Sequence, residues 1–223
     1  MKLFHLSDLH IGKQLHHYNL AAEQRKTLAQ IVAFAKSEHP DAILIAGDIY
    51  DTPVPSAEAV SVFDAFLSAL CEIEPQIAVM IIAGNHDSAR RIDFASSILA
   101  KHEVYIAGLP PMQEGETIRR VTLADGYGEV DFYLLPFVKP GYVRKLFDEE
   151  IKGYDMAVRR LIEREEIDPA RRCVILSHQF YTAGGKEPAT CDSTMSEALK
   201  MSMPECLRRS TMLHWDISTA HSI

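Results

Sequence analysis

The sequence is poor in cysteine, and the cysteines that it has lie far apart. Cys71, Cys173, Cys191 and Cys206 form no C-x-x-C pair. This spacing argues against a zinc ribbon, a thioredoxin motif and a secreted disulfide framework. We therefore expect a protein of the reducing cytoplasm.

Long apolar runs and biased segments are also missing. The first residues contain too short an apolar run for a signal peptide, and no later run approaches the ~20 residues of a membrane helix. Glycine and proline number only 11 each among 223 residues, and 47% of the residues are hydrophobic. This composition excludes collagen-like, low-complexity and disordered chains. We expect a soluble globular protein that does not bind a membrane.

Positive charge is scarce. The sequence has 23 lysines and arginines against 31 acidic residues, which gives a formal net charge of −8. Bulk charge therefore does not indicate binding to nucleic acid. A polyanionic substrate would need a local source of positive charge.

Short apolar runs alternate with longer helical patterns, which predicts an α/β fold. Pro40 is expected to end the first helix and Ser56 to cap the second. A hairpin through residues 125–128 makes the later sheet antiparallel in this prediction. The predicted strands are 2–6, 42–46, 77–83, 104–107, 117–123, 130–135 and 173–176, and the predicted helices are 20–37, 56–70, 93–101 and 143–166.

Chemically active side chains follow four of these strands, in the stretches Ser7–His10, Gly47–Asp51, Gly84–Asp87 and Ser177–His178. Loops at the carboxyl ends of such strands converge on one crevice, so we expect these residues to be neighbours. In an extended segment Asp8 and His10 point to the same side and can hold one cation together. Asp48 can bridge two cations through its two oxygens.

The donor set of carboxylate, amide and imidazole suits Mn, Fe or Zn better than Mg or Cu(I). Two divalent ions keep about half of their charge after Asp8 and Asp48 are counted, which favours a phosphate ester. Two ions about 3.5–4 Å apart can clamp phosphoryl oxygens and lower the pKa of a bound water towards about 7. We interpret His86 as the general acid for the leaving oxygen and Asp87 as the residue that orients its ring.

Each motif alone has an ordinary structural explanation. An isolated Asp-x-His is usually a solvated loop, a Gly-Asp after a strand is usually a turn, and a buried histidine usually belongs to the core. The stretch Gly84–Asp87 is more specific, because Asn-His-Asp has little structural reason to follow an apolar strand. The occurrence of four such motifs in one chain favours a metal site.

In order and spacing, these motifs resemble the signature of the calcineurin-like metallophosphoesterases. Residues 4–13 and 46–51 resemble more closely the nuclease branch of that family, and the resemblance covers about residues 1–193. It implies a layered α-β-β-α fold, in which helices flank a β-sandwich, and two Mn ions. It implies exonuclease and endonuclease cleavage of DNA in repair and recombination. It assigns His86 as the catalytic histidine and, as metal ligands, Asp8, His10, Asp48, Asn85 and His178.

The resemblance also implies partners. These are DNA, an SbcC-like ATPase subunit and a second copy of the chain, bound through the helix at 20–37 and the segment after Pro55. Two alternatives stay open. The core motifs also occur in phosphoesterases that act on nucleotides or phosphoproteins, because a fold does not determine a substrate. The chain is alternatively a non-catalytic remnant that only dimerises or binds DNA.

The family pattern ends in Gly-His-x-His, which this sequence does not contain. Codons for residues 213–219, read from their third base, permit Leu-Gly-His-Ile-His, and the same offset over 195–203 permits a more family-like continuation. We hypothesise a one-base insertion or deletion near Thr194, which the coding DNA would test. The nuclease domain would then be 1–193, followed by an out-of-frame or disordered tail at 194–223. We expect no capping domain, weakened metal binding and activity, and loss of the SbcC-like partner.

Overall fold

The computed structural model describes residues 1–179, and the chain divides into two compact units, Met1–Gly108 and Leu109–Ile223. Each unit has its own main sheet, with four strands in the N-terminal unit and three in the C-terminal unit. The two units are therefore described one at a time. Among residues 1–179, no helix combines the length and the apolarity needed to cross a bilayer.

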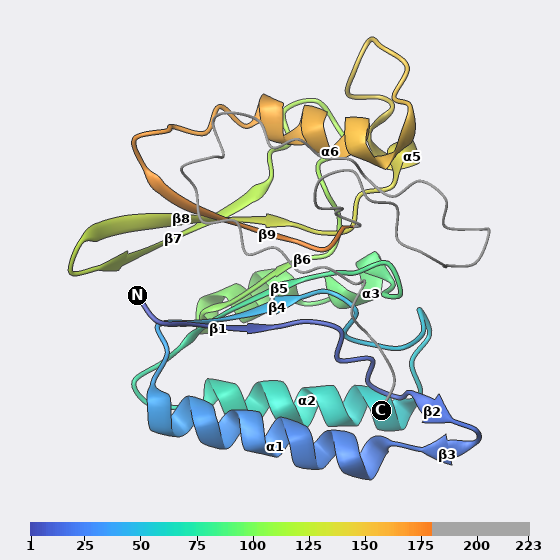
Figure 1. Cartoon of the computed structure of the whole chain (residues 1–223), viewed down its shortest axis with the longest axis vertical. Coiled ribbons are helices and arrows are strands. Elements are labelled where there is room, and N and C mark those ends of the chain that lie inside the picture. The colour runs from blue at the N-terminus through green and yellow to red at the C-terminus, as the bar shows by residue number, and fades with distance from the viewer. Residues whose placement is uncertain (180–223) are drawn as a thin grey trace, which may run out of the picture. The chain divides into compact units, whose positions relative to one another are not determined.

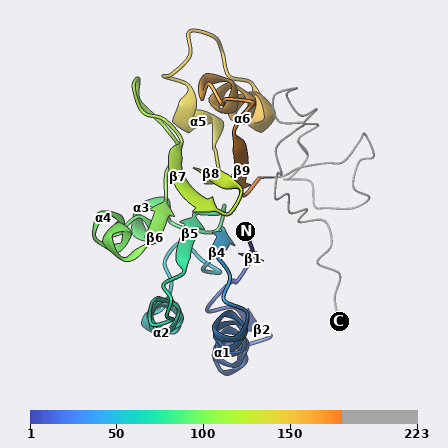
Figure 2. The same cartoon turned by 90° about the vertical axis from the view of Figure 1, so that its left-hand side faces the viewer.

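The N-terminal unit is a parallel sheet with strand order β1-β4-β5-β6. Helices α1 and α2 lie side by side against one face of this sheet (Figures 1 and 2). Its elements are β1 (Leu3–Leu6), β2 (Gln14–Leu15), β3 (Tyr18–Asn19), α1 (Ala21–Glu38), β4 (Ala42–Ala46), α2 (Ala57–Cys71), β5 (Ala78–Ile82), α3 (Ala89–Ile92), α4 (Ser96–Leu99), a 3₁₀ turn (Ala100–His102) and β6 (Val104–Ala107).

Sequence explains the order of this unit directly. Strands β4 and β5 are apolar throughout and buried at every position, as expected for parallel strands inside an α/β unit. Helix α1 turns Leu28, Val32 and Ala35 into the core. Helix α2 begins where predicted, because the Ser56 side chain accepts a hydrogen bond from the Ala59 N–H.

The C-terminal unit contains a mixed sheet in the order β7-β8-β9. Strands β7 and β8 are antiparallel, whereas β8 and β9 are parallel. Leu161 on the helix α6 packs in one core cluster with Tyr133 and Ile175 of the sheet. The elements are β7 (Arg119–Asp125), β8 (Gly128–Leu135), α5 (Pro140–Val143), α6 (Gly153–Arg164) and β9 (Arg172–Ser177).

Several predictions about these elements were wrong in detail. The single helix at 143–166 is two helices, and Gly153 adopts a φ of +80° where the second begins. The helix at 93–101 is broken because Ala95 lies in the left-handed region at φ +60°. The later sheet is mixed, because β9 pairs in parallel with β8. The hairpin β2–β3 was missed, since its strands are only two residues long and too short to show alternation.

Other predictions stand as they were made. The chain has the predicted α/β character, with helices flanking a parallel sheet. The pairing of the two sheets into a sandwich stays a prediction. The tail, the reading-frame hypothesis and the boundary at residue 193 lie outside the described residues.

Candidate metal centre

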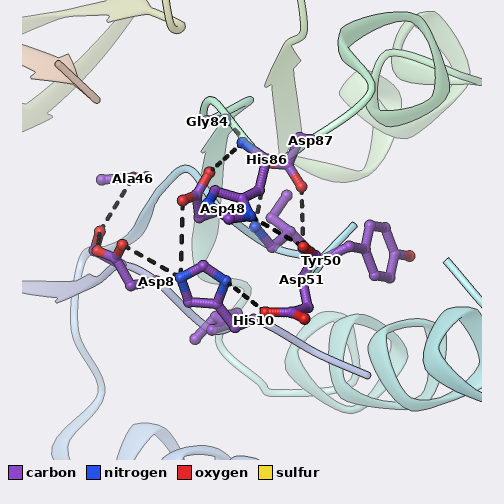
Figure 3. Close-up of polar contacts among 12 residues, drawn as sticks. Asp8, His10, Ala46, Asp48, Tyr50, Asp51, Gly84, His86 and Asp87 are labelled. Atoms are coloured by element: carbon purple, nitrogen blue, oxygen red, sulfur yellow. Dashed lines mark hydrogen bonds and ion pairs between the residues drawn. The ribbon is translucent and has the colours of Figure 1, made fainter. Parts of the chain in front are cut away.

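The loops that follow β1, β4 and β5 meet at the carboxyl edge of the parallel sheet. Asp8 and His10 follow β1, Asp48 follows β4, and His86 follows β5. Figure 3 shows these four side chains close to one another. The convergence that the motif positions predicted within residues 1–108 is therefore confirmed.

The donor atoms at this edge are close enough to share a cation. The Nε2 atom of His10 lies 3.7 Å from Asp8 Oδ1 and 3.8 Å from Asp48 Oδ2. His10, Asp48 and His86 each offer one ligand atom, and these atoms lie within 4.8 Å of one another. The rings of His10 and His86 meet edge to face, with their centroids 4.9 Å apart.

The electrostatics of the cluster also fit a divalent cation. Asp48 is only 2% exposed, so its carboxylate has lost most of its hydration. Asp8 holds the pKa of His10 above its ordinary value, and Asp48 and Asp51 act in the same direction. A pocket that favours a positively charged ring also favours a metal ion. The carboxylate and imidazole donors suit Mn, Fe or Zn.

The backbone at the site is strained. Asp8, His10 and Asp48 have φ values of 54°, 42° and 50°, in the left-handed region that non-glycine residues seldom occupy. Hydrogen bonds between the two loops hold this shape, because His10 N–H donates to the Asp48 carbonyl at 2.9 Å and Asp8 N–H to the Gly47 carbonyl at 3.2 Å. The strain therefore orients the ligand side chains before any cation arrives.

Gln24 of helix α1 supports the loop that carries His10. Its Oε1 atom accepts from the Gly12 N–H at 3.0 Å, and its Nε2 atom donates to the carbonyls of His10 and Leu9 at 2.7 and 3.3 Å. Sequence reasoning missed this role, because a glutamine on an amphipathic helix carries no signal of its own. The contact joins the first helix to the site.

Asp87 has a different role from the one predicted. Its oxygens accept hydrogen bonds from the backbone N–H groups of Ile49, Tyr50 and Gly84, at 3.1, 3.0 and 2.9 Å. Burial raises the pKa of Asp87, and these three bonds oppose that effect. The prediction that Asp87 orients the His86 ring is wrong, because its carboxylate joins the loops after β4 and β5 instead (Figure 3).

The His86 ring is held by another residue. Its Nδ1 atom lies 3.0 Å from the backbone oxygen of Asp51, and the His86 N–H donates to Asp48 Oδ1 at 2.9 Å. The carboxylate of Asp51 lies 3.2 Å from His10 Nδ1. The sequence analysis included Asp51 in a motif but assigned it no role. Its position three residues after Asp48 was the available signal.

Gly84 is required by the close approach of these loops. A Cβ atom at this position would lie 2.1 Å from Asp48 Oδ1 and 2.3 Å from Asp48 N, well inside contact distance. Gly84 therefore allows the β5 loop to pack directly against the buried Asp48 carboxylate.

Two predicted ligands are placed less completely. Asn85 is half-buried in the bend after β5, directly before His86. His178 lies in the C-terminal unit, where it follows β9, is 4% exposed and contacts the Phe137 ring. Both keep their ligand role as a prediction.

The comparison with protein families decides which group the chain joins. The family model described as calcineurin-like phosphoesterase matches residues 1–197. The chain belongs to the calcineurin-like phosphoesterase family. Membership of this family confirms the resemblance carried by the four strand-end motifs and implies divalent metal ions.

Similar proteins narrow the comparison further. The chain is 32% identical over 188 residues to a protein of Staphylococcus saprophyticus named as the SbcD component of the nuclease SbcCD, and the match covers 82% of this chain and 47% of that protein. It is also 32% identical over 189 residues to the protein of the same name from Staphylococcus epidermidis, with 83% and 48% covered. The chain thus spans about half the length of the curated relatives that it matches.

Proposed function

We propose that this calcineurin-like phosphoesterase is the nuclease part of an SbcD-like protein and hydrolyses phosphodiester bonds in DNA. The observation that carries the proposal is the convergence of Asp8, His10, Asp48 and His86 at one sheet edge. The names of the relatives support a nuclease over the other phosphoesterases.

We propose two divalent ions, with Mn as the preferred metal. The ligands would be Asp8, His10, Asp48, Asn85 and His178. When bound, such ions offset the charge of a phosphate and lower the pKa of water. The acidic chain supports this need, because its net charge of −8 would otherwise repel DNA.

His86 is proposed to supply the proton for the leaving oxygen. The Asp51 carbonyl can only accept a hydrogen bond, so Nδ1 of His86 must carry the hydrogen in their 3.0 Å contact. Nε2 is then the atom that exchanges a proton with a substrate oxygen. The carbonyl keeps the ring in one orientation while this proton moves.

The proposed partners are DNA, an SbcC-like ATPase subunit and a second copy of the chain, in the cytoplasm. The relatives are named as components of SbcCD, which supports the ATPase partner. Helices α1 and α2 carry exposed apolar side chains at Phe34 and Val60, which supports a homodimer through these helices. Light scattering of the chain and of a double variant, Phe34→Glu with Val60→Glu, tests the dimer.

The activity is tested with linear DNA and a chromogenic phosphodiester, each with Mn²⁺ and with a chelator. We expect DNA cleavage that the chelator abolishes, and its loss in Asp48→Asn and His86→Gln. Asp64→Asn, on the exposed side of α2, serves as the matched control. The rate is expected to be low, since the sequence has no Gly-His-x-His.

The outcomes separate the candidate functions. Cleavage of the chromogenic ester without cleavage of DNA would favour a phosphoesterase of small or protein substrates. A chain that binds no Mn²⁺ in calorimetry would be a non-catalytic remnant, and the proposal would fail.

A further inference from the structure

Asp51 contacts both histidines of the site through two different groups. Its Oδ1 atom lies 3.2 Å from His10 Nδ1, and its backbone oxygen lies 3.0 Å from His86 Nδ1. Its own N–H donates to the Ile11 carbonyl at 3.2 Å, which ties it to the loop that carries His10. One residue thus lies behind both rings (Figure 3).

The contact with His10 is made at a buried atom. His10 Nδ1 is buried and makes no aligned hydrogen bond within residues 1–179. A small rotation of the Asp51 carboxylate, 3.2 Å away, supplies the missing acceptor. If Nδ1 carries the hydrogen, Nε2 presents its lone pair towards Asp8 and Asp48.

We propose that Asp51 is the positioning residue of the metal centre. Its carboxylate selects the form of His10 in which Nδ1 is protonated and Nε2 is a metal ligand. Its carbonyl selects the same form of His86. A carboxylate behind a metal-binding histidine fixes the ring and strengthens the ligand. The inference rests on the proposed metal-binding function.

Direct ligation by Asp51 is the competing role. The compact group of candidate ligand atoms in the N-terminal unit contains His10, Asp48 and His86, and does not contain Asp51. The Asp51 carboxylate instead lies on the Nδ1 side of His10, opposite the atom that faces Asp8 and Asp48. This placement is that of a supporting group.

The test compares the full chain with Asp51→Ala and Asp51→Asn, and uses Asp64→Ala as a control that loses the same charge from an exposed site. Zn²⁺ serves as a diamagnetic probe. Affinity is measured by calorimetry, and the protonated ring nitrogens are identified by ¹⁵N–¹H correlation of histidine-labelled protein. Neither readout depends on catalysis.

We expect the wild-type chain to show His10 with a hydrogen on Nδ1 and Zn²⁺ on Nε2. Asp51→Ala is expected to weaken Zn²⁺ binding about 10–100-fold and to lose the Nδ1–H signal through exchange with water. Asp51→Asn keeps an acceptor oxygen, so it should retain the signal and lose only about threefold in affinity. His86 should be unchanged in all variants, because its partner is the main chain, and this signal reports that the loop is folded.

Two results would overturn the role of Asp51. One is a wild-type chain in which His10 Nδ1 binds Zn²⁺, and the other is Asp51→Ala with the affinity of Asp64→Ala. If the wild-type chain binds no Zn²⁺ at all, the proposed function itself fails. The experiment therefore distinguishes the two failures.

Discussion

Asp87→Asn separates a structural role for this residue from a catalytic one. The carboxylate accepts three backbone N–H groups, two on Oδ2 and one on Oδ1. An amide of the same shape keeps one acceptor oxygen and turns an NH₂ group towards a backbone donor. One hydrogen bond to a charged group contributes about 1.5–3 kcal/mol, and the remaining two become neutral bonds. We expect the free energy of unfolding to fall by about 2–4 kcal/mol, after partial relief of the buried charge.

The assay is urea unfolding at neutral pH, followed by circular dichroism. Asp93→Asn is the matched control, because Asp93 is exposed. Zn²⁺ affinity should fall together with stability, since the clamp holds the loop that carries Asp48. If Asp87→Asn unfolds at the same urea concentration as Asp93→Asn but cleaves DNA more slowly, the clamp is unimportant. Asp87 would then regain the catalytic role that its position beside His86 suggested.

Two further predictions concern packing and charge. Gly84→Ala places a methyl group 2.1 Å from Asp48 Oδ1 and should cost about 2–4 kcal/mol in urea unfolding and most of the metal affinity, whereas Gly126→Ala, whose Cβ meets nothing within 4 Å, should unfold like the wild type. Arg171 holds the pKa of the buried Asp131 below its ordinary value, so this stabilisation is present above about pH 4 and is lost as the pH falls through the lowered pKa. Arg171→Gln should therefore lower the urea midpoint at pH 7, with a difference from wild type that narrows in acid; a difference independent of pH would contradict the role of the pair.

The elements were most predictable where burial alone determines them. The strand at Ala42–Ala46 is bounded as predicted, because an uninterrupted apolar run of this length leaves little choice in an α/β unit. Helix boundaries failed where one residue adopts a left-handed backbone. Ala95 is an example, since alanine gives no warning of φ +60°.

The site was predictable at the level of which residues meet. Asp8, His10, Asp48 and His86 came together because strand ends of a parallel sheet share one edge. The hydrogen-bond partners were not predictable, because they depend on loop conformation. Asp87 binds backbone N–H groups that no motif reveals.

Gln24 has a consequence for how the site comes into being. All three polar hydrogens and lone pairs that it uses are committed to the segment that carries His10, so neither glutamate, which has no donor, nor leucine can replace it. The strained segment 8–12 therefore gains its support only when helix α1 has docked beside it. Assembly of the ligand geometry is a late, tertiary event in folding, and a peptide that ends before residue 24 would contain Asp8 and His10 without the means to aim them.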